Sequence, residues 1–243
     1  ADYENSDDYK YAQKKLSYFI NDLERFNIRT VLIADYSEIT EILQNIKRRY
    51  NNKTVYISGA AAEYNPDGKE SYEIFLSKLS SQLIKEGYKI VSGYGLGVGS
   101  AIISGALSEI YYKQKKSLND QLILRPFPQG DDARTLWGKY RQDMISYSGI
   151  SIFLLGNRIE KGSVVSSNGM RSEYEISKDQ GNFLIPVGRT GYISKELWAE
   201  LMKEKKDDCS FDIYRSEFED LGNESKTLDE LIEIIIRLIN KIK

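Results

Sequence analysis

A run of alternating glycines constrains the fold of this chain more than any other stretch. Residues 90–101 read IVSGYGLGVGSA, so an apolar segment ends in Gly93, Gly95, Gly97 and Gly99, and a small-residue helical pattern follows at once. Glycines this dense cost conformational entropy on folding, which calls for a structural reason. A turn from a buried strand into a helix provides one, because its bare backbone N–H groups can face an anion at the helix N-terminus.

The spacing of these glycines excludes two familiar phosphate-binding motifs. No three of them follow the Gly-x-Gly-x-x-Gly pattern of dinucleotide-binding folds, and no Lys-Ser or Lys-Thr pair follows as in a P-loop. A tight turn that only allows close packing of strand and helix remains the alternative to a phosphate cradle. We favour phosphate or nucleotide binding of a kind that uses neither motif.

Composition narrows the function further. The chain has 243 residues, a formal net charge of -2 without blocks of like charge, and no apolar run of membrane length. Nucleic acid and membranes are therefore not expected partners. The single cysteine excludes an internal disulfide and fits a reducing cytoplasm. Histidine is absent, which removes histidine metal sites and histidine-dependent catalysis, so we expect no metal and no resident cofactor.

The order of apolar patterns predicts an α/β protein with a doubly wound, mostly parallel, Rossmann-like sheet. Strands are expected at 54–57, 89–91, 122–124, 149–155 and 183–187, and helices at 70–86, 100–113, 136–147, 169–178 and 194–202. A capping box at 227–230 begins a last helix with one apolar stripe. Segment 160–168 is expected to be a loop rich in serine and glycine, and residues 203–226 show no clear pattern.

Residues 1–50 carry a separate unit. Apolar spacing predicts a helix over 8–26, a buried strand over 28–34 and a second amphipathic helix around 39–46. One strand alone is not a stable sheet. We therefore interpret residues 1–50 as the end of an upstream α/β domain and residues 51–243 as the main domain, with an extra layer on that domain as the alternative.

Small or polar segments follow four of the predicted strands. The carboxyl ends of parallel strands share one edge of a sheet, so these segments converge there. They comprise Ser58, Gly59 and Ala60; the turn with Gly93, Tyr94, Gly95, Gly97, Val98 and Gly99; the segment 125–129 with Phe127; and Gly156, Asn157 and Arg158. This convergence indicates a ligand site more strongly than any one motif does.

Charged side chains that could contact a nucleotide lie beside these segments. Arg141 and Arg158 could bind phosphate oxygens, and Glu173 could accept hydrogen bonds from ribose hydroxyls. Taken singly, each arginine could equally be a surface residue and Glu173 a carboxylate that favours a helix N-terminus. Phe127, Tyr94 and Tyr140 are candidates for stacking on a base, although a single aromatic side chain more often packs in a core.

These residues resemble the SLOG superfamily, which includes the LOG phosphoribohydrolases and the DprA/Smf proteins. The resemblance covers about residues 54–202 and rests on the strand-end segments, on Arg141-x-x-Met144 and on Gly169-Met170-Arg171-Ser172-Glu173. In LOG enzymes an arginine before the fourth strand and the glutamate of Pro-Gly-Gly-x-Gly-Thr-x-x-Glu cleave a nucleotide N-glycosidic bond. Arg141 and Glu173 fall at similar places, but the Pro-Gly-Gly-x-Gly-Thr part is replaced here, which argues against hydrolysis.

A closer resemblance is to the C-terminal SLOG domains of the sirtuin-type NADase effectors of Thoeris anti-phage defence. It implies a sensor that binds a cyclic ADP-ribose isomer, first of all the 3′-linked form, made by a TIR-domain protein. Binding would activate an NADase domain that is mostly absent from this chain, and residues 1–50 would be the end of that sirtuin-like domain. Arg141, Arg158 and Glu173 are the implied ligand residues, with Gly169 and Met170 beside them. A homo-oligomer, dimer or tetramer, is also implied.

Two other functions stay open. The chain could be a phosphoribohydrolase that releases ribose 5-phosphate from a nucleoside 5′-monophosphate, with Glu173 as the acid–base or nucleophilic carboxylate. It could also be a dimerisation domain whose pocket is vestigial.

Overall fold

The computed structural model describes residues 7–114, 121–128 and 133–242. The chain divides into two compact units, residues 1–45 and 46–243. Residues 115–120 lie outside the described residues, and so does Gln129, the last residue of the segment 125–129.

The first unit contains helices but no strand among its described residues. Helix α1 spans Asp7–Arg25, and α2, Glu38–Asn51, begins in this unit and ends in the second. The strand predicted at 28–34 is wrong, because these residues have no regular secondary structure. A strand needs a partner for its backbone hydrogen bonds, and none pairs with this segment in the described chain. No residue of α1 is buried, and the apolar side chains of Leu16 and Phe19 are exposed.

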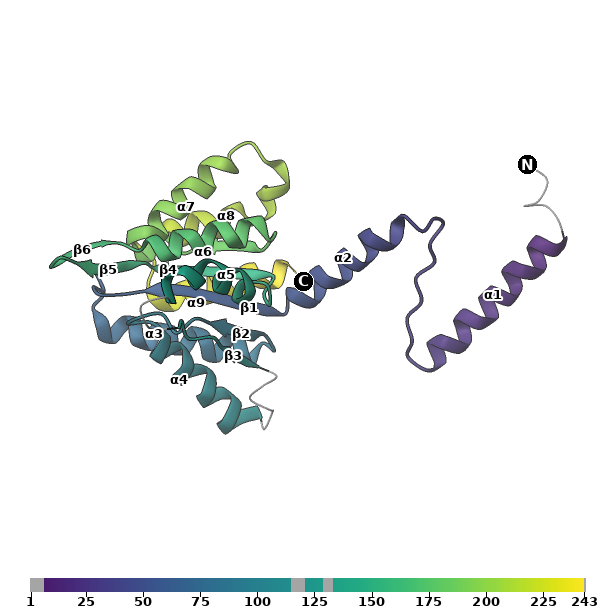
Figure 1. Ribbon diagram of the computed structural model, residues 1–243, viewed down its shortest axis with the longest axis horizontal. Coiled ribbons are helices and arrows are strands. Elements are labelled where there is room, and N and C mark those ends of the chain that lie inside the picture. The colour runs from purple at the N-terminus through teal and green to yellow at the C-terminus, as the bar shows by residue number, and fades with distance from the viewer. Residues whose placement is uncertain (1–6, 115–120, 129–132, 243) are drawn as a thin grey trace. The chain divides into compact units, whose positions relative to one another are not determined.

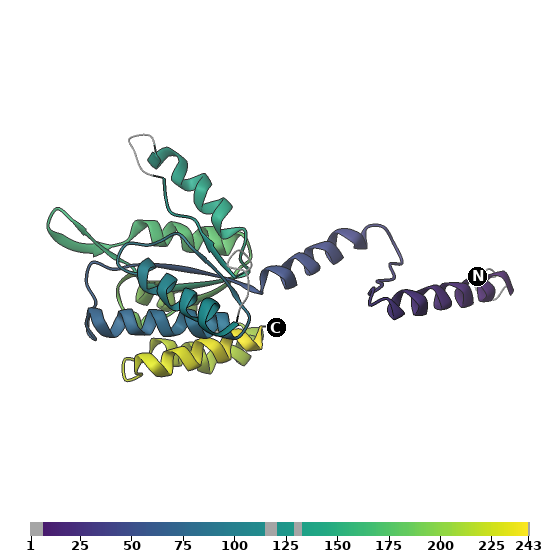
Figure 2. The same cartoon turned by 90° about the horizontal axis from the view of Figure 1, so that it is seen from below.

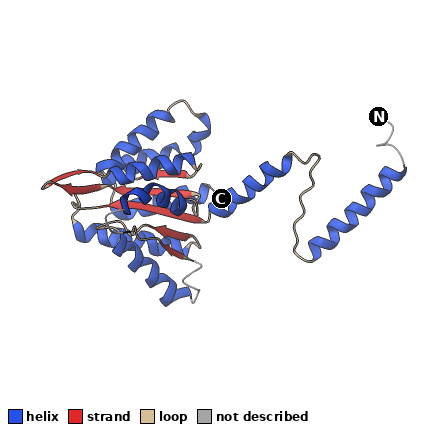
Figure 3. Ribbon diagram, in the orientation of Figure 1, coloured by secondary structure: helices blue, strands red, loops and turns tan. Residues whose placement is uncertain are grey.

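Five parallel strands form the sheet of the second unit, in the order β3-β2-β1-β4-β7 (Figure 3). Their bounds are Thr54–Ala60 for β1, Lys89–Ser92 for β2, Leu122–Leu124 for β3, Ile150–Leu155 for β4 and Phe183–Pro186 for β7. This order confirms the predicted doubly wound α/β fold. The connections change direction across the sheet between β1 and β4, and such folds bind ligands at the carboxyl ends of the strands beside that point.

Helices cover both faces of this sheet (Figure 2). The first face carries α3 (Lys69–Lys85), α4 (Gly99–Glu109) and α9 (Leu228–Lys241), and the second carries α5 (Ala133–Ile145) and α6 (Asn168–Asp179). Val55 and Ile57 of β1 belong to the core under the first face, whereas Tyr56 packs with Met144 and Ile145 under the second. This alternation follows from the two-residue period of a strand, and it also turns Ser58 toward the second face.

The remaining helices complete the layers. Helix α7 (Tyr192–Glu204) packs along β4 and β7, and α8 (Asp212–Gly222) packs against α9. The predicted capping box is confirmed at the start of α9, where Thr227 and Glu230 bind each other's backbone N–H groups. No helix in the described ranges has the length and apolar content needed to cross a lipid bilayer.

Two segments of the second unit differ from expectation. The region predicted as a loop at 160–168 is mostly an antiparallel hairpin of β5 (Asn157–Glu160) and β6 (Ser163–Ser166), which extends beyond the carboxyl ends of the parallel strands (Figure 1). Its strands are too short and polar to give a periodic apolar signal. Residues 203–226, which lack a pattern, contain η5 (Cys209–Phe211) and α8.

Candidate functional site

A narrow cleft opens at the carboxyl ends of β1 and β2, beside the first turn of α6. Its volume is about 110 Å³ and its lining residues are Tyr56, Ile57, Ser58, Gly59, Ala60, Gly93, Gly95, Phe127, Arg141, Ser167, Gly169, Met170 and Glu173. The structure therefore brings together most of the predicted strand-end residues with Arg141 and Glu173. Tyr56, Ile57 and Ser167 were missed. Tyr56 precedes Ser58 by two residues, so both side chains lie on the same face of the strand. The two-residue period of a strand could therefore have predicted Tyr56 as a site residue.

Glu173 receives a hydrogen bond on each carboxylate oxygen. The Ser58 hydroxyl donates to Oε2 at 2.6 Å, and Nε of Arg141 donates to Oε1 at 3.1 Å. Glu173 is only 8% exposed, a position that would be costly for a carboxylate without partners. Each oxygen keeps a further lone pair, so the fixed carboxylate can accept hydrogen bonds from sugar hydroxyls.

Arg141 turns an unused edge of its guanidinium toward the cleft. Its Nε binds Glu173, and its Cζ lies 4.9 Å from the ring centroid of Phe127 and 5.7 Å from that of Trp137. Neither terminal nitrogen has an acceptor among the described residues, although only 14% of the side chain is exposed. A largely enclosed guanidinium whose terminal nitrogens have no acceptor among the described residues matches two oxygens of a phosphate group.

Gly169 makes this placement of Arg141 possible. A Cβ at position 169 would lie 2.8 Å from Nη2 of Arg141. The absence of a side chain therefore lets the guanidinium approach the start of α6. The positive end of the α6 dipole lies at the same place, which further favours an anion in the cleft.

Tyr56 contributes a neutral phenol to the cleft wall. Burial raises the pKa of the Tyr56 hydroxyl well above its usual value, and the negative charge of the Glu173 carboxylate adds to the increase in pKa. The hydroxyl therefore remains protonated throughout the physiological pH range. The hydroxyl lies on the face of β1 that Ser58 shares, where it interacts with Glu173 and Ser58.

The glycine turn at 93–99 contributes to the packing of the backbone as well as to the lining of the cleft. A Cβ on Gly95 would overlap the carbonyl oxygen of Gly59, and Gly97 has a φ of +76°, where other residues are strained. The N–H groups of Val98 and Gly99 both donate to the Gly95 carbonyl, so these two amides are not available to a phosphate. Gly95 lines the cleft, and its N–H has no acceptor in the described part of the chain. Both interpretations of the turn therefore hold in part.

Some predicted site residues lie outside the cleft. They are Tyr94, Gly97, Val98 and Gly99 in the turn, and Gly156, Asn157 and Arg158 at the base of the hairpin. Val98 is buried, with its side chain packed beneath Gly59. Gly156 adopts a φ of +98° and has no room for a Cβ because Ile193 and Met170 pack against it. Tyr94 is half-exposed, with its ring beside Gly99.

Arg158 in particular is not brought to the cleft. It donates to Glu160 at 2.6 Å, and 41% of its side chain is exposed. Successive side chains of a strand point to opposite faces. Asn157 points inward, so Arg158 points outward. A ligand role for Arg158 stays a prediction, which requires the hairpin to approach a bound ligand.

Asn157 ties the hairpin to the loop after β1. Its Oδ1 accepts from the N–H groups of Ala62 and Glu63, each at 2.8 Å, and its Nδ2 donates to the Glu63 carbonyl at 2.9 Å. Asn157 is 1% exposed, so these groups have no easy access to water. The side chain therefore has a structural role that its place after a strand did not indicate.

Asn157→Ala is expected to lower the free energy of unfolding by about 2–3 kcal/mol, because buried donors and an acceptor lose their partner. Chemical denaturation measures this change. Asn157→Asp keeps the acceptor for both N–H groups but sets a buried carboxylate oxygen against the Glu63 carbonyl, so it is a control for hydrogen exchange and not for stability. Unchanged stability of Asn157→Ala would show that these hydrogen bonds contribute nothing to folding. Faster hydrogen exchange at Ala62 and Glu63 should accompany the alanine variant alone.

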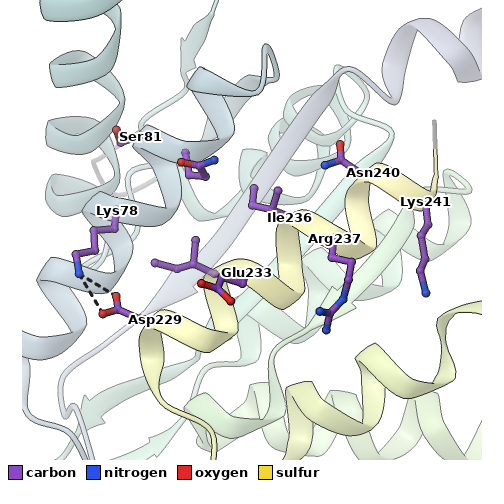
Figure 4. A pocket seen from close by; sticks show the side chains of 10 residues that line it. Lys78, Ser81, Asp229, Glu233, Ile236, Arg237, Asn240 and Lys241 are labelled. Atoms are coloured by element: carbon purple, nitrogen blue, oxygen red, sulfur yellow. Dashed lines mark hydrogen bonds and ion pairs between the residues drawn. The ribbon is translucent and has the colours of Figure 1, made fainter.

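A larger groove, of about 990 Å³, lies between α3 and α9 (Figure 4). Its basic side chains already have partners: Lys78 binds Asp229 at 2.9 Å, and Arg237 and Lys241 bind Glu217 at 3.2 and 2.7 Å. The cleft at the strand ends is smaller but holds donors without acceptors. We therefore place the binding chemistry in the cleft.

The sheet order, the glycine turn and the Arg141–Glu173 pair at the switch point define a Rossmann-like domain of the SLOG type. The model of the Sir2- and TIR-associating SLOG family, STALD, matches residues 38–242, and this chain belongs to that family.

Curated relatives carry the name NAD(+) hydrolase ThsA. The protein of Bacillus cereus (strain MSX-D12) is 46% identical over 240 residues, which cover 96% of this chain and 49% of that protein. The protein of Cytobacillus dafuensis is 41% identical over 248 residues, 99% of this chain and 50% of that protein. The protein of Enterococcus faecium is 41% identical over 246 residues, 100% of this chain and 51% of that protein. The chain thus spans about half the length of these relatives.

Proposed function

We propose that this chain is the ligand-sensing part of a ThsA-type NAD(+) hydrolase in Thoeris defence, and that its cleft binds a cyclic ADP-ribose isomer. The observation that carries the proposal is the Arg141 guanidinium, whose terminal nitrogens lack acceptors in the described chain although the side chain is largely buried. We assign the hydrolase activity to the part of such a protein that this chain does not span. The chain itself then acts by binding.

The phosphates and the ribose hydroxyls of a cyclic ADP-ribose have matching groups in the cleft. The free edge of Arg141 and the N–H of Gly95 suit phosphate oxygens, and the Glu173 carboxylate suits the ribose hydroxyls. A cleft of about 110 Å³ is smaller than the roughly 300 Å³ at which ligand pockets usually begin. It can hold a phosphate and part of a ribose, so the rest of the ligand must lie over its rim.

As a sensor, the domain must bind the ligand more tightly in one state of the whole protein than in another. In this proposal a TIR-domain protein in the cytoplasm makes the ligand, and subunits of a homo-oligomer rearrange when it binds. No nucleic acid, membrane, metal or resident cofactor takes part. Ligand binding would shift the oligomer toward the arrangement in which the hydrolase part is active.

Calorimetric titration with cyclic ADP-ribose linkage isomers tests this proposal. One isomer, the 3′-linked form first, is expected to bind with a dissociation constant on the order of micromolar or lower, which corresponds to about -8 kcal/mol. Linear ADP-ribose is the control, because it has the same groups without the ring closure. The absence of binding heat with every cyclic isomer would end the proposal.

Phosphoribohydrolase activity is a second candidate function, because Arg141 and Glu173 lie together in the cleft. Incubation with AMP followed by detection of free adenine distinguishes the two. Both Glu173 oxygens already accept hydrogen bonds, so we expect the carboxylate to bind ribose hydroxyls and not to act in hydrolysis. The protein should then release no adenine from AMP. Adenine release that Glu173→Gln abolishes would favour the hydrolase.

A further inference from the structure

Three aromatic side chains form a fixed cluster at the Arg141 side of the cleft. Phe127 follows β3, and Trp137 and Tyr140 lie on α5, with ring centroids 5.9 Å and 5.4 Å from that of Phe127. Nε1 of Trp137 donates to the Pro128 carbonyl at 3.2 Å, and the Tyr140 hydroxyl donates to the Pro126 carbonyl at 3.0 Å. The cluster therefore holds the segment after β3 in place before any ligand arrives.

Arg141 connects this cluster to the cleft. The same guanidinium lines the cleft and lies 5.7 Å from the Trp137 ring centroid. Trp137 itself does not line the cleft and is partly exposed. A ligand whose phosphate occupies the free edge of Arg141 therefore has the indole ring within reach as it leaves the cleft.

We infer that Trp137 forms the base subsite of the bound nucleotide and stacks on its purine ring. This inference rests on the proposed function, because it takes the phosphate to be at Arg141. The cleft is too small for the whole ligand, so the base must lie over the rim, and the α5 rim offers a preorganised aromatic surface. The hairpin rim offers instead the exposed Arg158–Glu160 pair. A purine is favoured because stacking requires a broad π-face and the indole ring presents one.

Affinities of Trp137 variants test the inference. The probes are the cyclic ADP-ribose isomers, AMP and ribose 5-phosphate, which has no base. Trp137→Ala is expected to weaken binding of every base-bearing probe by about 5- to 150-fold, the usual range for base–aromatic stacking, and to leave ribose 5-phosphate unchanged. Trp137→Phe keeps an aromatic face and should stay within a few-fold of wild type.

Tyr140→Phe is the matched control. It removes the hydroxyl that anchors the Pro126 carbonyl but leaves every ring of the cluster in place. Wild-type affinity in this variant would show that loop anchoring alone does not account for the Trp137 effect. A loss equal to that of Trp137→Ala would overturn the stacking role.

Tryptophan fluorescence gives an independent readout. The chain has two tryptophans, and the other, Trp198, packs against Gly222 and donates to the Phe218 carbonyl. A base that stacks on Trp137 should quench fluorescence in wild type, and Trp137→Phe should abolish the quenching while binding persists. Quenching that persists in Trp137→Phe would overturn the inference.

The outcomes separate this inference from the proposed function. If a cyclic isomer binds and Trp137→Ala has no effect, the base subsite is wrong and the sensor function stands. If Trp137→Ala weakens binding of ribose 5-phosphate as much as binding of the base-bearing probes, the base subsite is also refuted. Trp137 would then act through Arg141 and not by stacking on a base. If no cyclic isomer binds but AMP binds in a manner that depends on Trp137, the subsite stands without the sensor function. If none of the probes binds, both are wrong.

Discussion

Arg141→Ala is expected to weaken binding of the proposed cyclic ADP-ribose ligand by about 30- to 5,000-fold, because truncating a buried, hydrogen-bonded charge typically costs about 2–5 kcal/mol. The variant removes the cation that lines the cleft and leaves the Glu173 carboxylate facing the phosphate. Arg141→Lys should recover only part of the affinity, since an ammonium cannot present two parallel donors. Calorimetry measures these changes.

Loss of binding must be separated from loss of folding. Arg141→Ala leaves the buried Glu173 without one of its two donors, which we expect to lower the free energy of unfolding by about 3 kcal/mol. Combining it with Glu173→Gln removes the uncompensated charge and should restore most of that stability without restoring binding. Arg171→Ala is the matched control, because Arg171 lies on α6 and pairs with Glu196 and Glu200 outside the cleft. A double variant that binds normally would contradict the role of Arg141.

Gly95→Ala is expected to reduce stability by about 2–3 kcal/mol and to lower the unfolding midpoint by about 5–10 °C. The new Cβ would overlap the carbonyl oxygen of Gly59, so two backbone segments have to separate. Since both residues line the cleft, ligand binding should be lost as well. Thermal unfolding with and without ligand measures both effects.

Gly138→Ala is the opposite case. Gly138 lies within α5, and a Cβ there would have no heavy atom within 4 Å. The substitution should raise stability by about 0.5–1 kcal/mol, because alanine loses less backbone entropy in a helix. Equal destabilisation by the two substitutions would show that contact with Gly59 is not what makes Gly95 necessary.

The position of the cleft could be predicted from sequence because parallel strands place their carboxyl ends along one edge. Ser58 lies near the carboxyl end of β1, and Gly93 and Phe127 follow β2 and β3, so all three line one cleft. The contact between Arg141 and Glu173 required more than this rule. It depends on α5 and α6 covering the same face of the sheet, and here the family resemblance added what the local pattern does not contain.

The predictions that the structure does not bear out also depended on tertiary contacts that the local sequence does not contain. Residues 28–34 have the composition of a strand, but composition cannot supply a neighbouring strand. Arg158 follows β4 by few residues, yet a hairpin with a two-residue period turns it outward and turns Asn157 inward. Helix α8 lies in a polar stretch whose few apolar residues, such as Phe218 and Leu221, suffice because they are fully buried.

The pairing of Arg141 with Glu173 makes the cleft electrically neutral before anything binds. Inorganic phosphate can reach the guanidinium, but it also meets a carboxylate that repels it and to which it brings no sugar hydroxyl. A ligand that presents a phosphate beside a ribose hydroxyl satisfies both groups together. If the proposed sensor function holds, this neutral pair would lower the response to inorganic phosphate, and the parts of the ligand beyond the phosphate and ribose would have to distinguish it from other nucleotides.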